Sequence, residues 1–391
     1  MSDPRGPVPF LDLRAQYAGL RGEIRAALDD LFERQAFVLG EPVAALEREV
    51  AAFLEARRAV GCASGSDALL LVLHALGVGP GDEVICPSFT FFATAGAVAR
   101  LGARPVFADI DPASYCLDPA AARAAAARCR RLRAIVAVHL YGRAADNDAL
   151  LALAAEHGVP LVEDAAQAIG ARDASGRRVG ARGRAACLSF YPTKNLGGAG
   201  DGGMVTTDDD ALAERLARLR VHGSPRRYEH DELGMNSRLD ALQAAVLRVK
   251  LGRLEAWNAA RRAHARAYDE AFAKAGARPS SVPLAAGGLP LRTPEPPAPP
   301  AESACHLYVV RVPRTRREAL RAHLGAAGIG CDVYYPLGLH QQRCFAEAAR
   351  EARLPHTEDA AAEVLALPLY PELRDEQREQ VVEAVLAGLG G

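Results

Sequence analysis

The stretch Ser189-Phe190-Tyr191-Pro192-Thr193-Lys194-Asn195-Leu196-Gly197-Gly198 places a lysine between a short apolar segment and a glycine-rich turn. The chain has many arginines but only three lysines, Lys194, Lys250 and Lys274. Unlike arginine, a lysine with a lowered pKa can lose its proton, and its amine can then form an imine. Because Lys250 and Lys274 lie in a long helical pattern, we interpret them as ordinary charges on a helix face. Lys194 is therefore the candidate catalytic lysine.

Short apolar runs alternate with helical patterns on both sides of this stretch. The expected strands are 84–86, 105–107, 134–138, 160–164, 185–190 and 203–206, and the expected helices between them are 93–100 and 146–157. This alternation predicts an α/β fold around a mainly parallel sheet. Ligands of such sheets bind at the carboxyl ends of the strands, so the residues that follow each strand are the candidates for a site.

The two ends of the chain extend this unit. Residues 17–54 predict two helices broken near 39–42, and residues 239–274 predict one long connecting helix. The Pro- and Ala-rich segment 275–301 is expected to be an irregular or mobile loop. A strand (307–312), a helix (315–327), a strand (330–334) and helices to the end then predict an α+β unit. We therefore expect two domains, with an N-terminal arm and the large cofactor-binding domain in 1–250, and the connecting helix and a small domain in 251–391.

Composition excludes several classes of protein. The formal net charge of -1 over 391 residues gives no general attraction for nucleic acid or an anionic membrane surface. No run of about 18 apolar residues predicts a membrane span, and residues 1–5 do not resemble the start of a signal peptide. The eight cysteines form no C-x-x-C pair, so we expect reduced thiols and no metal site. These features predict a cytoplasmic protein.

The segment 63–69 could bind a phosphate. Small residues, including Gly65 and Ser66, lead into an apolar helix, and a helix N-terminus with free N–H groups binds anions. A plain N-cap by Ser64 or Ser66 explains the same pattern. Ser189, at the end of an expected strand, could contact the same phosphate.

An acid follows the expected strand 160–164. Asp164 could hold a protonated ring nitrogen through an opposite-charge interaction, and Gln167 could reach the same ligand. A capping or turn acid is the alternative. The glycine-rich run 198–203 precedes an expected strand rather than a helix, which argues against a dinucleotide site. With the aromatic segment around Phe91 as a flat apolar surface, these parts meet the needs of pyridoxal phosphate: an amine, phosphate donors, a ring-stacking face and an anion.

Ordered blocks along nearly the whole chain resemble the DegT–StrS family of sugar aminotransferases. These blocks are 10–13, 79–84, 139–142, 163–167, 191–197, 236–240 and 335–336. The resemblance implies the fold-type-I architecture of pyridoxal-phosphate-dependent transferases. It also implies glutamate as amino donor, a nucleotide-linked keto sugar as acceptor, and a homodimer with shared active sites.

The resemblance assigns roles to individual residues. Lys194 would bind the cofactor covalently and move the proton, Asp164 would contact the pyridine nitrogen and Gln167 the ring hydroxyl. Phe91 would stack on the ring. The remaining cofactor contacts, all to the phosphate, would be Gly65, Ser66, Ser189 and, from the other subunit, Asn236.

The acceptor is less well defined by the sequence. The segment 226–238, with Arg226 and Arg238, resembles members that act on 3-keto sugars, and its arginines could grip a pyrophosphate or a uronate carboxylate. A solvated basic loop is the alternative. Tyr335 and His340 are candidate sugar contacts, whereas Tyr334 stands where some uronate-using relatives carry histidine. The sequence favours a 3-keto sugar, either a UDP-linked 2-acetamido uronic acid or a dTDP-linked 6-deoxyhexose.

Two other functions are compatible with the same fold. Sugar dehydratases of this fold carry histidine in place of the lysine, so Lys194 favours transamination. A non-catalytic sensor or regulator is the second alternative, because some members of the family were described as regulatory. The chain has no evident helix-turn-helix segment or basic face for DNA binding.

Overall fold

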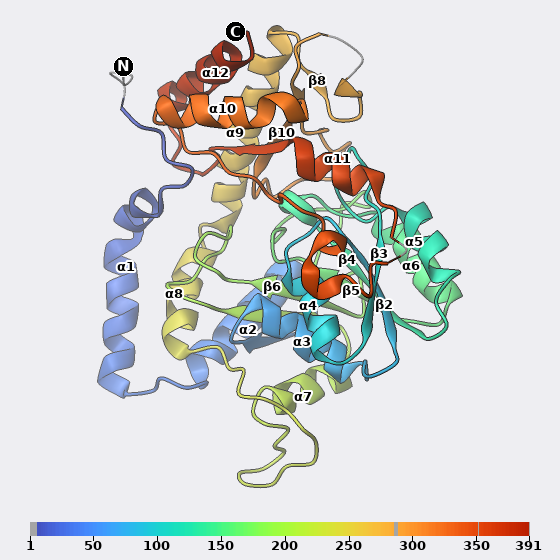
Figure 1. Ribbon diagram of the computed structural model, residues 1–391. Coiled ribbons are helices and arrows are strands. Elements are labelled where there is room, and N and C mark those ends of the chain that lie inside the picture. Colours follow the sequence, from blue (N-terminus) through green and yellow to red (C-terminus); the bar gives the residue numbers. More distant parts are fainter. Residues whose placement is uncertain (1–5, 285–287, 351, 391) are drawn as a thin grey trace.

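A seven-stranded sheet forms the centre of the larger part of the computed structural model, which describes residues 6–284, 288–350 and 352–390 (Figure 1). Its spatial order is β1 (Arg58–Cys62), β7 (Gly203–Thr207), β6 (Ala185–Ser189), β5 (Leu161–Asp164), β4 (Leu132–Val138), β2 (Glu83–Pro87) and β3 (Arg104–Ala108). The strands from β6 to β3 pair in parallel, whereas β7 is antiparallel to both of its neighbours. The prediction of an α/β fold with a mainly parallel sheet is confirmed.

Two hydrophobic cores cover the two faces of this sheet. Successive residues of a strand point to opposite faces, so Val84 and Cys86 of β2 join one core and Ile85 joins the other. The first core includes α3 (Gly65–Ala75), α4 (Ala93–Arg100) and α7 (Asp210–Leu219), and the second includes α5 (Pro119–Ala126) and α6 (Asn147–Glu156). Strands buried on both faces need continuous apolar runs, which is why the sequence predicts them well.

The predicted pair of N-terminal helices is confirmed as α1 (Leu13–Arg34) and α2 (Glu41–Leu54). Gly40 separates them with a φ of 78°, a conformation that glycine adopts without steric cost. Figure 1 shows α1 running along one side of the molecule beside α8 (Ala241–Leu251). Leu20 and Ile24 of α1 pack against Val246 of α8.

A second, four-stranded sheet lies in the C-terminal part. Its order is β11 (Val364–Leu367), β10 (Tyr308–Arg311), β9 (Arg292–Thr293) and β8 (Arg278–Pro279). The helices of this part are α9 (Leu254–Lys274), α10 (Arg314–Ala326), α11 (Pro355–Glu363) and α12 (Asp375–Gly390). Tyr268, Leu324 and Val385 join α9, α10 and α12 in a third core. Single 3-10 turns are η1 (Leu140–Gly142), η3 (Leu339–Gln341) and η4 (Arg343–Phe345).

Two predictions about this C-terminal part are wrong. The expected single helix over 239–274 is two helices, because α8 ends at Leu251 and α9 begins at Leu254; Gly252, a poor helix former, lies between them. The expected strand over 330–334 is reduced to one bridge between Asp332 and Ala366. The Asp332 carboxylate accepts the Val333 N–H at 2.8 Å and so competes with ladder bonding. Instead, β11 forms in a region that was expected to be helical.

The segment 275–301 is more ordered than expected, since it contains β8 and β9. Arg292 is buried there and donates hydrogen bonds to backbone carbonyls on both sides of the turn, including those of Val282 at 2.8 Å and Pro283 at 2.7 Å. Residues 285–287 of this segment, and residues 1–5 on which the signal-peptide expectation rests, lie outside the described residues. Within the described ranges, no helix is both long and apolar enough to cross a membrane.

Candidate active site

Lys194 lies in the loop that joins β6 to β7, and a local turn fixes its backbone. Its N–H donates to the Tyr191 carbonyl at 2.8 Å. Gly197 closes the turn, where an added Cβ would lie 2.2 Å from the Pro192 carbonyl oxygen. Only glycine fits that close approach, so the sequence Pro-x-Lys-x-x-Gly sets the position of the lysine.

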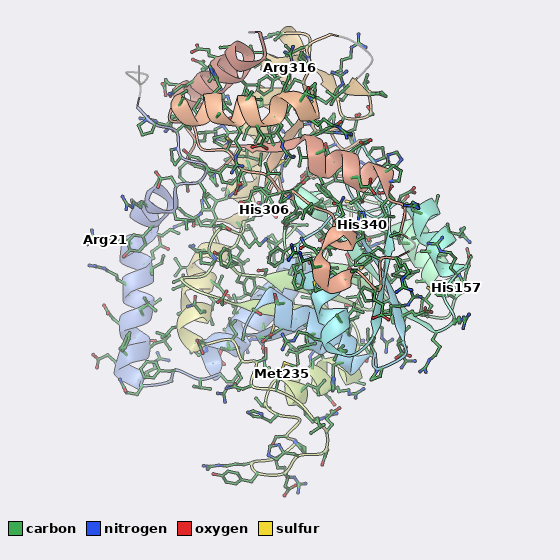
Figure 2. All side chains as sticks on the ribbon, viewed as in Figure 1. Arg21, His157, Met235, His306, Arg316 and His340 are labelled. Carbon is green, nitrogen blue, oxygen red and sulfur yellow. The ribbon has the colours of Figure 1, made fainter. Side chains whose placement is uncertain are left out.

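A buried polar network anchors the residue that follows. The Asn195 side-chain amide donates to Asn258 Oδ1 at 2.8 Å and to the Ala304 carbonyl at 2.7 Å. Asn195 Oδ1 therefore accepts from His306 Nδ1, which lies 3.0 Å away. Figure 2 shows His306 at the junction between the C-terminal helices and the large sheet. The network thus ties the lysine loop to both parts of the molecule.

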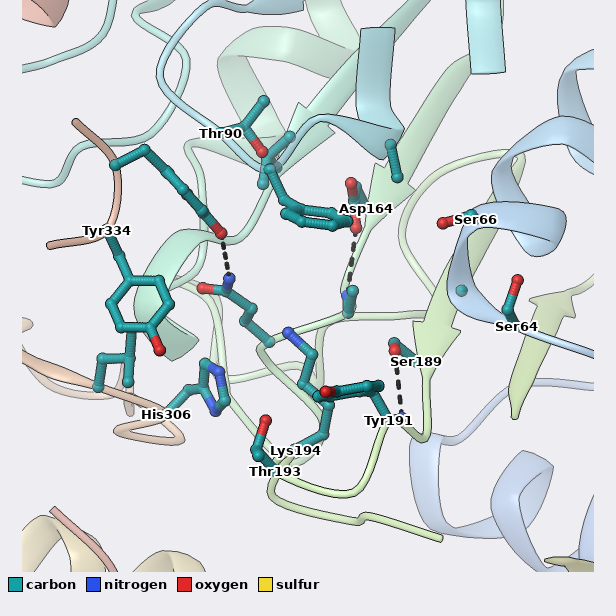
Figure 3. A pocket seen from close by; sticks show the side chains of 18 of the residues that line it. Ser64, Ser66, Thr90, Asp164, Ser189, Tyr191, Thr193, Lys194, His306 and Tyr334 are labelled. Carbon is teal, nitrogen blue, oxygen red and sulfur yellow. Dashed lines mark hydrogen bonds between the residues drawn. The ribbon is translucent and has the colours of Figure 1, made fainter. Parts of the chain in front are cut away.

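A cavity of about 610 Å³ opens at the carboxyl ends of the central strands, beside Lys194 (Figure 3). It gathers most of the predicted site residues from five separate segments of the chain. These residues are Gly65, Ser66, Phe91, Asp164, Gln167, Ser189, Lys194 and Tyr335. The cavity therefore lies where ligands of parallel α/β sheets bind.

Asp164, the last residue of β5, is the buried acid of the cavity. Its Oδ2 accepts from the Thr94 hydroxyl at 2.8 Å and its Oδ1 from the Ala166 N–H at 3.3 Å. Burial raises the pKa of this carboxyl, while the two hydrogen bonds and the nearby Lys194 amine oppose that rise. A carboxylate desolvated in this way is stabilised by a cation, which is what a protonated ring nitrogen would supply.

The Lys194 amine has the opposite shift. Burial lowers its pKa to about 8, and the Asp164 carboxylate limits the decrease. An ordinary lysine amine is almost wholly protonated near neutral pH and is then no nucleophile. The environment of Lys194 makes the free amine accessible in that range, as covalent attachment of an aldehyde requires.

Gln167 lies across the cavity and is held at both ends. Its Oε1 accepts the Tyr141 N–H at 2.8 Å, and its Nε2 donates to the Tyr335 hydroxyl at 3.1 Å. Phe91 is 57% exposed, with its ring centroid 6.3 Å from that of Tyr335. An aromatic ring that is exposed at a cavity wall can cover a flat ligand.

The N-terminus of α3 forms the other end of the cavity. Ser64 is the N-cap, since its hydroxyl accepts the Asp67 N–H at 3.1 Å, so the capping interpretation is confirmed for Ser64. An added Cβ on Gly65 would lie 2.7 Å from Ser189 Cβ, so the helix start packs directly against the end of β6. Ser66 and Ser189 line the same end of the cavity, where the free N–H groups of the helix N-terminus can bind an anion.

These residues fit pyridoxal phosphate. The α3 N-terminus and Ser189 suit its phosphate, Phe91 suits its ring, and Asp164 suits its pyridine nitrogen. Lys194 reaches the cavity between these groups, where the aldehyde would be (Figure 3). The buried Asp164 carboxylate and the Lys194 amine of lowered pKa lie in the same cavity. Ionisable groups with perturbed pKa values in one cavity are more typical of a functional site than of a structural one.

Four predicted site residues lie outside this cavity. Arg226, Asn236 and Arg238 belong to the segment between α7 and α8, which projects from the molecule in Figure 1, and Arg226 and Asn236 are exposed. His340 is turned elsewhere: its Nδ1 lies 2.7 Å from the Ser88 hydroxyl and its Nε2 3.4 Å from Glu358. His340 therefore does not line the cavity, and its contact with a sugar stays a prediction.

Sequence reasoning missed several residues of the site. Thr94 lies in an ordinary helix pattern, and Arg261 is one of many arginines, so neither carries a local signal. His306 lies just before β10, and a histidine beside an expected strand is a local signal that could have made it a candidate. The interpretation of Lys250 as a helix-face charge is wrong, because Lys250 is buried and its Nζ donates to the Gly197 carbonyl at 2.6 Å. In the described part of the chain, no cluster of three or more metal-ligating side chains occurs.

Comparison with known proteins gives a family match and close relatives. The DegT/DnrJ/EryC1/StrS aminotransferase family matches residues 19–386. A pleiotropic regulatory protein of Geobacillus stearothermophilus is 47% identical over 379 residues, 97% of each chain. The UDP-N-acetyl-3-dehydro-alpha-D-glucosamine 3-aminotransferase of Acidithiobacillus ferrooxidans is 44% identical over 384 residues, 98% of each chain. The dTDP-3-amino-3,4,6-trideoxy-alpha-D-glucose transaminase of Streptomyces venezuelae is 46% identical over 379 residues, 97% of this chain and 95% of the relative.

A solved structure has the same fold. The crystal structure of S. venezuelae DesV in complex with a ketimine intermediate superposes with a TM-score of 0.90, at 45% identity and with 98% of both chains covered. The similarity confirms the predicted fold class of an α/β transferase with a large central sheet.

Proposed function

The chain belongs to the DegT/DnrJ/EryC1/StrS aminotransferase family, whose members depend on pyridoxal phosphate, and on that premise we propose that it moves an amino group from glutamate to a nucleotide-linked 3-keto sugar. The observation that carries the proposal is the pairing, in one cavity, of the Lys194 amine of lowered pKa with the buried Asp164 carboxylate.

The chain's own residues divide the work of such a reaction. When bound, pyridoxal phosphate supplies the electron sink. Lys194 would hold the cofactor and, as the free amine, would take and return the proton at the reacting carbon. Asp164 would keep the ring nitrogen protonated through its charge, and Thr94 would orient Asp164. The α3 N-terminus and Ser189 would hold the phosphate and so keep the reacting carbon within reach of Lys194.

The names of relatives support the acceptor class. The A. ferrooxidans relative is named for a UDP-linked 3-dehydro sugar and the S. venezuelae relative for a dTDP-linked 3-amino sugar. Both names place the nitrogen at carbon 3. We infer a 3-keto acceptor, either a UDP-linked 2-acetamido sugar, with or without a uronate carboxylate, or a dTDP-linked 6-deoxyhexose. Tyr335, at the cavity wall, is the candidate sugar contact.

We further infer a homodimer in which each subunit completes the site of the other. Asn236 and Arg226 are exposed and lie outside the cavity of their own chain. The same projecting segment exposes two apolar side chains, Tyr228 at 81% and Leu233 at 89%. Exposed apolar and arginine side chains together are typical of an interface. Arg226, Asn236 and Arg238 would then reach the partner's cofactor phosphate and nucleotide.

The two alternative functions have less support. A dehydratase without a covalently held cofactor does not use a lysine in the environment of Lys194. A regulatory role is the printed description of the G. stearothermophilus relative. That description is of another protein. A pocket that only binds a ligand does not need an amine of lowered pKa beside a buried carboxylate, so the pairing of Lys194 with Asp164 favours an enzyme.

Trapping of the cofactor on the protein tests the proposal. Reduction of the loaded protein with borohydride should leave a pyridoxyl group on the peptide that contains Lys194. Prior addition of glutamate should abolish this label, because the cofactor then leaves the lysine. Lys274→Ala changes an exposed lysine and should label like the wild type, whereas Lys194→Ala should not label. A label that persists after glutamate would reject glutamate as the donor.

A further inference from the structure

A buried arginine lies at the end of the cavity opposite the α3 N-terminus. Arg261 of α9 lines the cavity together with His306 and Leu369. Figure 3 shows His306 on one side of Lys194 and Ser64 and Ser66 on the other. Arg261 Nη1 donates to the His306 carbonyl at 3.2 Å, which places the guanidinium on the His306 side. It is therefore remote from the proposed phosphate position.

Within the described residues, the Arg261 side chain, which is 3% exposed, forms hydrogen bonds through Nη1 alone. Nη1 donates to the carbonyls of Leu369 at 2.8 Å, His306 at 3.2 Å and Cys305 at 3.4 Å. Nε is buried and has no hydrogen-bond partner among the described residues. No carboxylate of the described ranges forms an ion pair with this guanidinium.

Two other enclosed arginines of the chain each form an ion pair with a carboxylate. Arg220 pairs with Glu47 at 2.5 Å, and Arg311 pairs with Glu363 at 2.6 Å. Glu372 acts on Arg261 through its charge without forming an ion pair with it. A buried cation that lacks an ion pair costs free energy that such a pair would offset. Burial lowers the pKa of Arg261 to about 10, so it remains charged near neutral pH. The fold thus holds a desolvated positive charge open toward the cavity.

From this arrangement we propose that Arg261 binds a carboxylate group of the amino donor. The inference rests on the proposed function, since it names the group that the first substrate presents to this site. The proposed position of the cofactor phosphate has its own donors across the cavity, at the α3 N-terminus and Ser189. Nη2 of Arg261 has no hydrogen-bond partner among the described residues and can donate a charge-assisted hydrogen bond to a small carboxylate.

His306 does not compete for the carboxylate as a second cation. Burial, Lys194 and Arg261 together keep its pKa well below the ordinary value, so its ring is neutral. Its Nδ1 hydrogen is directed to Asn195. His306 therefore positions the lysine loop, and Arg261 supplies the charge.

Two variants separate donor binding from a structural role. Arg261→Met keeps side-chain length and removes charge, and Arg262→Met changes the neighbouring, partly exposed arginine as a matched control. In Arg261→Met, the Kd for glutamate in the first half-reaction, and the Kd for 2-oxoglutarate by calorimetry, should rise about 10- to 150-fold. The Kd of the keto sugar for the pyridoxamine form should stay unchanged, as should all values in Arg262→Met.

The opposite results overturn the inference. If a folded Arg261→Met protein has an unchanged Kd for glutamate, the inference is wrong. If glutamate and sugar binding weaken equally, Arg261 has a structural role and the inference is also wrong. Because Arg261 also clamps three carbonyls, the variant could fail to fold. The wild-type enzyme then gives the answer with the two monoamides of glutamate, of which at least one should bind 10- to 150-fold more weakly. If both amides bind as tightly as glutamate, the inference is overturned and the proposed function stands. If the wild type neither binds nor uses any dicarboxylate, the proposed function is rejected as well.

Discussion

The Nζ atom of Lys250, on α8, donates a hydrogen bond to the carbonyl of Gly197, three residues after Lys194, at 2.6 Å. Burial lowers the pKa of Lys250 to about 8. Between this value and the ordinary lysine pKa, the unfolded chain binds more protons than the folded one. The contribution of Lys250 to stability therefore increases as the pH rises through that interval.

This relationship predicts how stability depends on pH. From about pH 7 to about pH 10, the wild type should gain about 1–3 kcal/mol of unfolding free energy relative to Lys250→Met. Urea unfolding at both pH values measures the difference. Lys274→Met, at the exposed end of α9, should follow the wild type. A Lys250→Met protein whose stability also follows the wild type would show that Lys250 is not desolvated.

The lowered pKa of Lys194 predicts the pH dependence of cofactor capture. Only the neutral amine attacks an aldehyde, so the rate at which the apoprotein attaches pyridoxal phosphate should rise with pH around a midpoint of about 8. The Asp164 carboxylate raises the Lys194 pKa, so Asp164→Asn should move the midpoint to lower pH. Stopped-flow absorbance measures both. A midpoint near the ordinary lysine pKa would contradict the burial of the amine.

Thr94 is expected to lower the pKa of Asp164, the carboxyl proposed to contact the ring nitrogen of the cofactor. Its hydroxyl lowers the pKa of Asp164 through the 2.8 Å hydrogen bond, so Thr94→Val should raise that pKa. The acidic limb of the kcat profile should then move to higher pH by about one unit. Thr90→Val is the matched comparison, because the Thr90 hydroxyl contacts Thr94 and not Asp164. Identical pH profiles for the two variants would show that the Thr94 hydroxyl does not set the pKa of Asp164.

Gly203 packs against the start of α3, at the proposed phosphate end of the cavity. An added Cβ would lie 2.3 Å from the Ser64 carbonyl carbon, so Gly203→Ala must displace the start of α3. We expect at least a tenfold weaker affinity for pyridoxal phosphate, corresponding to about 1–3 kcal/mol of overpacking. Fluorescence titration measures it. Gly79→Ala, whose Cβ would meet nothing within 4 Å, should bind normally. Normal binding by Gly203→Ala would place the phosphate elsewhere.

A shared active site predicts complementation between two inactive variants. Lys194→Ala loses the cofactor lysine, and Asn236→Ala is expected to lose the contact that reaches the partner's phosphate. Refolding the two together should form mixed dimers in which one site has both residues, so activity should return. Separate refolding of each variant is the control. Failure to regain activity in mixtures shown to contain mixed dimers would confine Asn236 to its own subunit.

The sequence predicts this protein best where local pattern and burial agree. The strand that ends at Asp164 and the loop around Lys194 were both identified, because apolar runs and glycine spacing are local signals. Lys250 and Arg261 were not, because whether a cation on a helix is buried depends on contacts far along the chain. For the same reason the sequence predicts helix where β11 forms, because that strand depends on pairing with β10, which is distant in the sequence.

Transfer of labelled nitrogen tests the central claim most directly. The loaded enzyme would be incubated with glutamate that carries heavy nitrogen and with UDP- and dTDP-linked 3-keto sugars, and the products analysed by mass spectrometry. The account predicts heavy nitrogen at carbon 3 of one nucleotide sugar, with 2-oxoglutarate formed in equal amount and no transfer by Lys194→Ala. A sugar that loses oxygen without gaining nitrogen, or a protein that binds both compounds and transfers nothing, would contradict it.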